Sequence, residues 1–94
     1  MSVKIFITRK VAEGDIIELT VLLKKLRSLT INQPGYISGE TLRRVDKKGE
    51  SLVISTWRSV EDWENWFNSE KRKAIQGQVD NLLGEKTKYA VYES

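Results

Sequence analysis

The side chains of this 94-residue chain that could do chemistry are aromatic rings, amides and carboxylates, because the sequence contains neither histidine nor cysteine. Without imidazole or thiol groups, histidine acid–base catalysis, cysteine nucleophiles and the common zinc and haem ligands are excluded. The sequence also lacks carboxylates at metal-ligand spacing and a glycine-rich loop that could bind phosphate. We therefore expect no metal and no cofactor.

A cluster of aromatic and amide side chains between residues 57 and 76 is the best candidate for a substrate pocket. Val60, Trp63 and Phe67 share one helical stripe, which predicts core positions, and Trp66 lies about a quarter-turn from that stripe. Trp66 therefore either lines a pocket or covers the edge of the core. An amide can orient a hydroxyl or carbonyl group of a ligand, or it can lie on a solvated helix face, but it cannot act as a general base at neutral pH. The candidate pocket residues are Trp57, Asn65, Trp66 and Gln76, with Tyr36 and Glu40 from an earlier part of the chain.

Several of these candidates have a structural alternative. Trp57 ends a predicted strand and belongs either to a pocket wall or to a dimer contact. Glu40 is the one strand carboxylate that could act as a base if it is buried. Otherwise it forms a salt bridge or lies exposed at an edge of the sheet. Tyr36, Tyr89 and Tyr92 could donate hydrogen bonds to an aromatic substrate, or they could pack as amphipathic side chains.

The elements that must position these residues begin with a strand and an amphipathic helix. Alternation and β-branched residues predict a strand from Val3 to Arg9, with Val3, Ile5 and Ile7 on one face. Apolar residues at three- and four-residue steps predict a helix of about four turns that opens at Gly14-Asp15. Its apolar face consists of Ile16, Leu19, Leu22, Leu23, Leu26 and Leu29. Asn32-Gln33-Pro34-Gly35 ends this helix, because proline disfavours helix in the residue before it and glycine permits a turn.

The second half of the chain predicts a hairpin, a broken helix and a last strand. Strands from Tyr36 to Val45 and from Leu52 to Arg58 flank a loop that bends at Gly49. Ser59 and Asp62 form a capping box that starts a helix at Val60. The rest is predicted to be a kink near Asn68-Ser69, a helical piece that turns Ala74, Ile75, Val79 and Leu82 inward, an end at Gly84, and a strand from Lys86 to Tyr92.

This β-α-β-β-α-β order predicts a single α+β domain over residues 1–94, a ferredoxin-like two-layer sandwich with both helices on one face of an antiparallel sheet. If Ile5 meets the helices, Phe6 points away from them. On the returning strand, Leu52 and Ile54 oppose Val53 and Trp57 in the same way, which puts Val53 and Trp57 on the far face with Phe6. A lone two-layer domain keeps that face polar. We therefore predict a homodimer joined through the sheet faces.

Two motifs resemble the antibiotic biosynthesis monooxygenase family. Asn32-Gln33-Pro34-Gly35-Tyr36 resembles its P-G-Y/F turn, and the stretch from Trp57 to Trp63 followed by Trp66 resembles its W-x-S-x-E-x-(W/F)-x-x-W signature. The resemblance covers the whole chain in length and element order, and it implies a dimeric α/β barrel in which two ferredoxin-like sheets pack face to face. Some members oxidise aromatic polyketides or quinols with O₂ and without metal or flavin. The resemblance thus implies a small cofactor-independent monooxygenase for an electron-rich aromatic such as a quinol or phenol, with a pocket between the sheet and the second helix.

Two other functions stay open. The first follows from the same resemblance, because other members of that family degrade haem. They use an Asn on the first strand and a Trp and a His on the second helix. By position the Trp corresponds to Trp66, the His falls at Gln76, and the first strand has no Asn. The second alternative is a non-catalytic small-molecule-binding or stress-associated dimer on the same scaffold. RNA binding through the sheet is discarded, because the third strand lacks the motif that it needs.

Charge and hydropathy bound the partners and the location. The net charge of +3 is spread along the chain, which is typical of a solubility feature, so we expect no nucleic-acid partner. The run Lys71-Arg72-Lys73 is predicted to be a solvated helix face, with attraction of an anionic ligand as its alternative. The sequence has no signal-peptide pattern and nothing close to about 18 consecutive apolar residues, so we expect no membrane partner and a cytoplasmic location.

Overall fold

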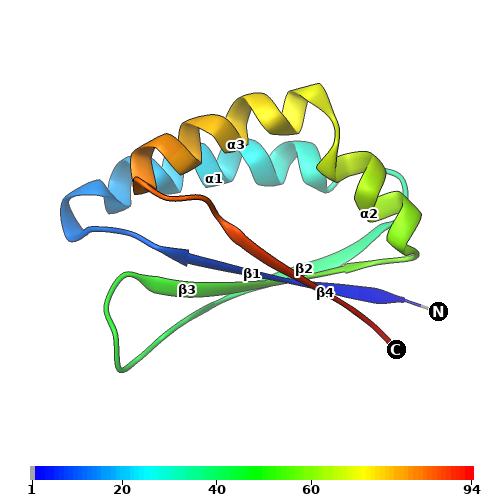
Figure 1. Cartoon of the computed structure of the whole chain (residues 1–94), viewed down its shortest axis with the longest axis horizontal. Coiled ribbons are helices and arrows are strands. Elements are labelled where there is room, and N and C mark those ends of the chain that lie inside the picture. Colours follow the sequence, from blue (N-terminus) through cyan, green and yellow to red (C-terminus); the bar gives the residue numbers. More distant parts are fainter. Residues whose placement is uncertain (1) are drawn as a thin grey trace.

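One antiparallel sheet of four strands is covered on one face by three α-helices in the computed structural model, which describes residues 2–94 (Figure 1). In chain order the elements are β1 (Val3–Lys10), the 3-10 turn η1 (Glu13–Asp15), α1 (Ile16–Thr30), β2 (Tyr36–Arg43), β3 (Glu50–Trp57), α2 (Val60–Phe67), α3 (Glu70–Leu83) and β4 (Lys88–Glu93). The predicted α+β ferredoxin-like order is confirmed, and the second helix is divided into α2 and α3 at the expected break. Within the described residues, no helix is both long enough and apolar enough to cross a membrane.

Two serine caps explain why the second helical segment is divided. The Ser59 Oγ atom accepts a hydrogen bond from the Asp62 amide at 3.1 Å, as the capping box predicts. The Ser69 Oγ atom accepts from the Arg72 amide at 3.1 Å and starts α3 in the same way. Gly84 ends α3 with a φ of 72°, a left-handed conformation that glycine adopts without a steric penalty.

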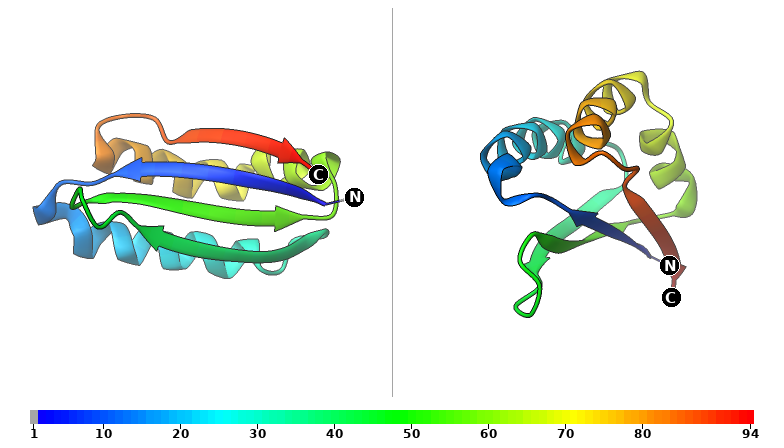
Figure 2. Two further views of the ribbon diagram at one scale, coloured as in Figure 1. Left: turned by 90° about the horizontal axis from the view of Figure 1, so that it is seen from below. Right: turned by 60° about the vertical axis from the view of Figure 1, so that its left-hand side comes forward.

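Strand pairing decides which side chains face the helices. The strand order is β2-β3-β1-β4, and Ile7 of β1 lies opposite Val53 of β3 and Tyr89 of β4. Directly paired residues share a face of the sheet, so Val53 and Tyr89 point toward the helices with Ile7. The opposite row contains Phe6 and its partner Ile54, on the face that no helix covers (Figure 2, left).

The expected far-face positions of Val53 and Trp57 are therefore wrong. Trp57 pairs with Val3, so both it and Val53 belong to the helix-facing row, and Leu52 and Ile54 take the outward row instead. The error arises because alternation shows that two residues lie on opposite faces but does not show which face the helices cover. Both faces of β3 still carry apolar side chains.

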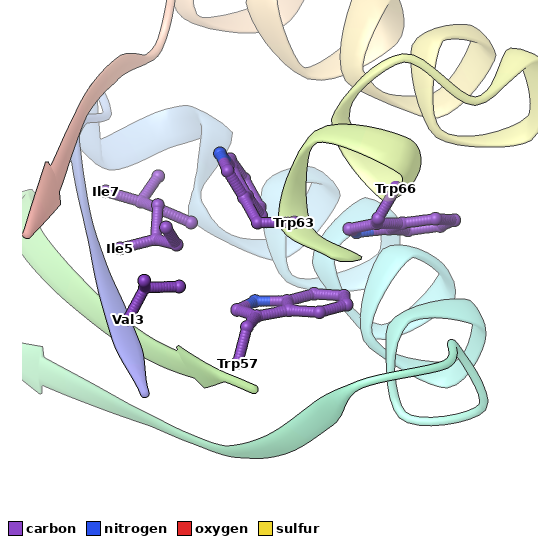
Figure 3. Packing of buried hydrophobic residues seen from close by; sticks show 6 residues of the cluster. All are labelled: Val3, Ile5, Ile7, Trp57, Trp63 and Trp66. Atoms are coloured by element: carbon purple, nitrogen blue, oxygen red, sulfur yellow. The ribbon is translucent and has the colours of Figure 1, made fainter. Parts of the chain in front are cut away.

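The core lies between the sheet and α2 and contains three tryptophans. Val3, Ile5 and Ile7 of β1 pack there with Trp57, Trp63 and Trp66 (Figure 3). Trp57 has no exposed surface, and its ring centroid lies 5.4 Å from that of Tyr36 and 5.8 Å from that of Trp63. This burial within one chain places Trp57 in the core and rules out its alternative role in a dimer contact.

A second, smaller cluster joins α1 to α3. Leu19 and Leu22 of α1 bury their side chains against Val79 of α3, in agreement with the inward positions predicted for all three. Ala74 is exposed, so its predicted inward position is wrong. The buried residues of α3 are instead Arg72, Gln76 and Val79, which follow one another at helical spacing, and two of them are polar.

Candidate functional site

A cavity of about 630 Å³ lies between α1 and the sheet and reaches the aromatic side chains of α2. Residues of α1 form much of one wall: Ile16, Leu19, Thr20, Leu23, Lys24, Leu26, Arg27 and Thr30. The helix-facing row of the sheet forms the opposite wall, and α2 and α3 contribute Trp63, Trp66, Arg72 and Gln76. The expected pocket between the sheet and the second helix therefore extends along the first helix as well.

One end of the cavity is aromatic. Trp63 and Trp66 line it from α2 and are 5% and 4% exposed, so each indole packs against the core while part of it borders the cavity. Tyr36 and Tyr89 line the cavity from β2 and β4. Trp57 does not line the cavity, but it packs against Tyr36 and Trp63, which do. Its indole N–H donates to the Ser55 Oγ atom at 2.7 Å. Ser55 is buried and lines the cavity, and because its oxygen accepts this bond, its hydroxyl hydrogen can donate to a ligand.

Arg72 lines the cavity, and its guanidinium group lies against aromatic rings. Its guanidinium carbon lies 4.5 Å from the Phe67 ring centroid and 5.2 Å from that of Tyr89. Its Nη1 donates to the Phe67 carbonyl oxygen at 3.1 Å, and its Nη2 donates to the Tyr89 hydroxyl oxygen. Only 5% of Arg72 is exposed. The prediction of a solvated face for this residue is therefore wrong, because cation–π contacts and hydrogen bonds hold the guanidinium against the core.

Arg9 is a second buried guanidinium in the same cavity. It is the last helix-facing residue of β1 after Val3, Ile5 and Ile7, and it is 5% exposed. Its Nε atom is buried and has no hydrogen-bond partner. Burial lowers the pKa of Arg9, although the neighbouring Tyr89 and Asp80 partly oppose that effect. The ion pairs formed within residues 2–94 involve Lys10 and Arg44, so no carboxylate of the described chain pairs with Arg9.

The charges of both Arg72 and Arg9 act on the Tyr89 hydroxyl. Burial raises the pKa of Tyr89 above its usual 10.0, and the charges of Arg72 and Arg9 only partly offset this. The phenol is therefore protonated at neutral pH. Because its oxygen accepts from Arg72, the phenolic hydrogen remains free to donate into the cavity that Tyr89 lines.

The Gln76 amide is oriented by a polar network on the α3 side. Its Nε2 donates to Asp80 Oδ1 at 2.9 Å and to Thr87 Oγ1 at 2.8 Å. The Asp80 carboxylate accepts and does not donate, so the NH₂ end of the amide must face it. The Oε1 atom is left buried and without a partner, in a residue that lines the cavity. Gln76 thus offers a hydrogen-bond acceptor to a ligand.

Basic residues are concentrated in the lining of the cavity, although the net charge of the whole chain is only +3. The lining contains seven basic residues, Arg9, Lys24, Arg27, Arg43, Arg44, Lys48 and Arg72, against two acidic residues, Glu40 and Glu50. Glu50 is further neutralised by Arg44, whose Nη1 lies 2.6 Å from a Glu50 carboxylate oxygen and lowers the pKa of Glu50. The cavity therefore presents a positive potential to an entering molecule.

The six residues proposed from the sequence are partly brought together. The cavity is lined by Trp66 from α2, Gln76 from α3 and Tyr36 from β2. Glu40 borders the cavity on β2, but it is exposed and pairs with the outward-facing Ile54. Trp57 lies in the core, and Asn65 is exposed outside the cavity.

Arg9 and Ser55 were missed from the sequence, and Arg72 was assigned to a solvated helix face with attraction of an anionic ligand as the alternative. A signal for Arg9 existed, because strand alternation continues the inward row of Val3, Ile5 and Ile7 to position 9. For Arg72, the spacing to Gln76 and Val79 places all three on one face of α3. Ser55 follows from alternation only after the covered face of β3 is known.

These features define an α+β ferredoxin-like protein whose cavity between the layers has apolar walls, an aromatic end and more basic than acidic residues in its lining. The sequence profile of the family described as antibiotic biosynthesis monooxygenase matches residues 2–78, and the chain belongs to this family. No curated protein sequence matches it.

Solved structures share the fold at low sequence identity. A conserved protein from Methanosarcina mazei Go1 superimposes with a TM-score of 0.91 at 16% identity, over 100% of this chain and 93% of the other. A variant of SnoaB, a cofactor-independent oxygenase from Streptomyces nogalater, gives a TM-score of 0.86 at 14% identity over 99% and 92%. The protein Rv0793 from Mycobacterium tuberculosis gives 0.86 at 19% identity over 100% and 95%. At these identities the likeness establishes the fold.

Proposed function

We propose that this protein is a cofactor-independent monooxygenase that acts on an electron-rich aromatic of the quinol or phenol type. The observation that carries the proposal is the cavity of about 630 Å³ whose aromatic end contains Trp63 and Trp66. A planar aromatic ring can pack against such walls, and a cavity of this size accepts a ligand of several fused rings. Membership of the family and the oxygenase activity named for the Streptomyces nogalater protein support the same class of reaction.

The reaction can be balanced with the substrate and O₂ alone. A phenol with a free ring position para to its hydroxyl loses the ring hydrogen and the hydroxyl hydrogen and becomes a quinone. One oxygen atom of O₂ becomes the new carbonyl oxygen, and the other leaves as water with both hydrogens. All four electrons that reduce O₂ come from the substrate.

The protein's contribution is to bind, orient and polarise the substrate. The Ser55 hydroxyl can donate to the substrate oxygen, which stabilises the phenolate that transfers electrons to O₂. The Gln76 Oε1 atom can accept from a second hydroxyl of a quinol and fix its orientation. The apolar side chains that α1 contributes to the wall, Leu19, Leu23 and Leu26, reduce the access of water to the reduced oxygen intermediates.

The test is O₂ uptake with a panel of quinols and hydroxynaphthalenes in the presence of a metal chelator. For substrates with a free ring position para to the hydroxyl, we expect one O₂ consumed and one of its oxygen atoms incorporated per quinone formed, without release of hydrogen peroxide, at a rate well above that of autoxidation without protein. Trp66→Ala should reduce the rate at least tenfold, and Tyr92→Phe, which alters an exposed residue outside the cavity, should not change it. Uptake at the autoxidation rate with every substrate would overturn the proposal.

A non-catalytic binding protein is the second candidate, and one observation favours it. Among the described residues that line the cavity, the two carboxylates are poor bases for a bound substrate: Glu40 is exposed on the edge strand, and Glu50 is paired with Arg44. Binding of aromatic ligands without O₂ uptake would support this candidate.

We also propose that two copies of the chain associate through their uncovered sheet faces, and that the dimer acts in the cytoplasm. The outward row carries Phe6, Leu52 and Ile54, and the Phe6 ring packs edge-on against Tyr92 with centroids 5.0 Å apart. Tyr92 and Leu42 are 60% and 47% exposed in one chain. Burying these side chains against a second copy would stabilise the pair by the hydrophobic effect.

A further inference from the structure

The two buried guanidiniums of the cavity have no anionic partner within the described residues. Arg9 and Arg72 are each 5% exposed, and the carboxylates of residues 2–94 that form ion pairs do so with Lys10 and Arg44. Asp80 is near enough to act on both arginines, but it lies beyond ion-pair distance and accepts hydrogen bonds from Gln76 and Thr87. Buried charges are expected to be paired, so the site lacks the group that would neutralise it.

Packing accounts for Arg72 but not for Arg9. The Arg72 guanidinium lies against the rings of Phe67 and Tyr89 and uses Nη1 and Nη2 in hydrogen bonds. Arg9 lacks such a contact among the described aromatic residues, and its buried Nε atom has no partner. Leaving a buried donor unsatisfied destabilises the fold, and more so when the group is charged. A ligand oxygen in the cavity would remove that cost.

A second donor stands beside Arg9. The Tyr89 hydroxyl lines the cavity, is influenced electrostatically by both arginines, and has its hydrogen free because Arg72 donates to its oxygen. The two donors come from the neighbouring strands β1 and β4. A carboxylate, which is planar and shares one negative charge between two oxygen atoms, can accept from both.

We infer that Arg9 and the Tyr89 hydroxyl, with Arg72 behind it, form a subsite for a carboxylate, so that the ligand of this cavity is an aromatic acid. The carboxylate accepts from Arg9 and Tyr89, and the ring extends toward Trp63 and Trp66. The basic rim residues, among them Lys24, Arg27 and Lys48, attract the acid from solution. This inference rests on the proposed function for the presence of an aromatic ligand, and it adds the charge of that ligand.

The test compares two probes of the same shape by titration calorimetry at neutral pH: 2-naphthoate, which is ionised, and 2-naphthamide, which is neutral. We expect the wild type to bind the acid at least tenfold more tightly, since hydrogen bonds between two charged groups are stronger than those to a neutral acceptor. Arg9→Gln should weaken binding of the acid at least tenfold and binding of the amide by much less, so that the two affinities become equal within a factor of two. Arg58→Gln, which removes an exposed arginine outside the cavity, should retain the preference.

The outcomes are distinct. Equal affinity for the two probes in the wild type overturns the inference, and so does a preference that survives in a folded Arg9→Gln variant. If Arg9→Gln does not fold, Arg9→Lys decides: it keeps the charge but not the Nε donor, and it should bind the acid with intermediate affinity. Wild-type affinity for the acid in Arg9→Lys would instead assign the effect to general positive charge and overturn the subsite.

Acid preference without O₂ uptake contradicts the proposed oxygenase alone, and O₂ uptake without acid preference contradicts the carboxylate subsite alone.

Discussion

The Tyr89 hydroxyl on β4 accepts a hydrogen bond from Nη2 of Arg72 on α3, although the two residues are 17 positions apart in the sequence. This bond ties the helical layer to the sheet next to the cavity. It also determines what each side chain can offer a ligand, because it occupies the phenol oxygen and leaves the phenol hydrogen free.

The first prediction concerns this bond and pH. Because burial raises the pKa of Tyr89, the folded protein retains the phenolic proton at a pH where the unfolded chain loses it. The free energy of unfolding should therefore fall as the pH rises above about 10. Urea unfolding at pH 9 and pH 11 should show a smaller fall for Tyr89→Phe than for the wild type. Tyr92→Phe, which removes an exposed phenol, should show the wild-type fall, and an equal effect of the two variants would refute the assignment.

At neutral pH, Tyr89→Phe should lose about 1 kcal/mol of stability, because the buried Arg72 Nη2 donor loses its acceptor. Tyr92→Phe should stay within about 0.5 kcal/mol of the wild type. Chemical denaturation measures both values, and unchanged stability in Tyr89→Phe would mean that water replaces the phenol as acceptor.

The second prediction is that Arg9→Met makes the protein more stable while it weakens acid binding. Methionine has a similar length and removes a buried charge whose Nε atom has no partner. Replacing buried charged groups by apolar ones is often neutral or stabilising, so we expect a gain of about 1 kcal/mol in the free energy of unfolding. Arg58→Met is the exposed control and should change stability by less than about 0.5 kcal/mol. A clear loss of stability in Arg9→Met would assign Arg9 a structural role.

The third prediction separates core tryptophan from cavity tryptophan. Trp57→Phe should destabilise the fold by about 2 kcal/mol, because Trp57 is fully buried and its indole bonds to Ser55. Trp66→Phe should cost less than about 1 kcal/mol, since part of this side chain borders a cavity rather than packed atoms. Urea midpoints compare the two variants. Trp66→Phe should also abolish the fluorescence change that a small aromatic ligand causes, and equal destabilisation by both variants would make Trp66 a core residue.

The fourth prediction is a homodimer. Light scattering at micromolar concentration should give a mass of two chains for the wild type and one chain for Ile54→Lys, because Ile54 lies in the outward row opposite Phe6. Val45→Lys adds the same charge at a fully exposed position after β2 and should remain dimeric. A wild-type mass of one chain would refute the association.

The fifth prediction is that haem is not a physiological substrate. The resemblance to haem-degrading members implies that their haem-ligating histidine falls at Gln76, which has no imidazole and whose amide nitrogen is used in bonds to Asp80 and Thr87. Titration of haem followed by ascorbate under O₂ should give neither a saturable one-per-chain Soret shift nor loss of the Soret band with release of iron. Observation of both would favour the haem-degrading alternative.

Much of the fold follows from local patterns in the sequence. The alternation of Val3, Ile5 and Ile7 predicts β1, and the leucines of α1 predict its buried face, because a strand and a helix each repeat their side-chain directions at a fixed period. Ser59 and Gly84 predict helix ends, because caps act on backbone groups within a few residues. These features are local, so they are available without tertiary information.

The polar half of the site was decided by tertiary structure. Lys71-Arg72-Lys73 has the pattern of a solvated face, and Arg72 is buried only because α3 packs where Phe67 and Tyr89 enclose its guanidinium. The direction of the Gln76 amide depends on Asp80 and on Thr87, which follows the end of α3. The sequence by itself determined the fold, the family and the aromatic candidates, and its alternation places Arg9 in the inward row. The enclosure of Arg72 and the free hydrogen-bonding atoms of Tyr89 and Gln76 depend instead on contacts between distant segments that no local period encodes.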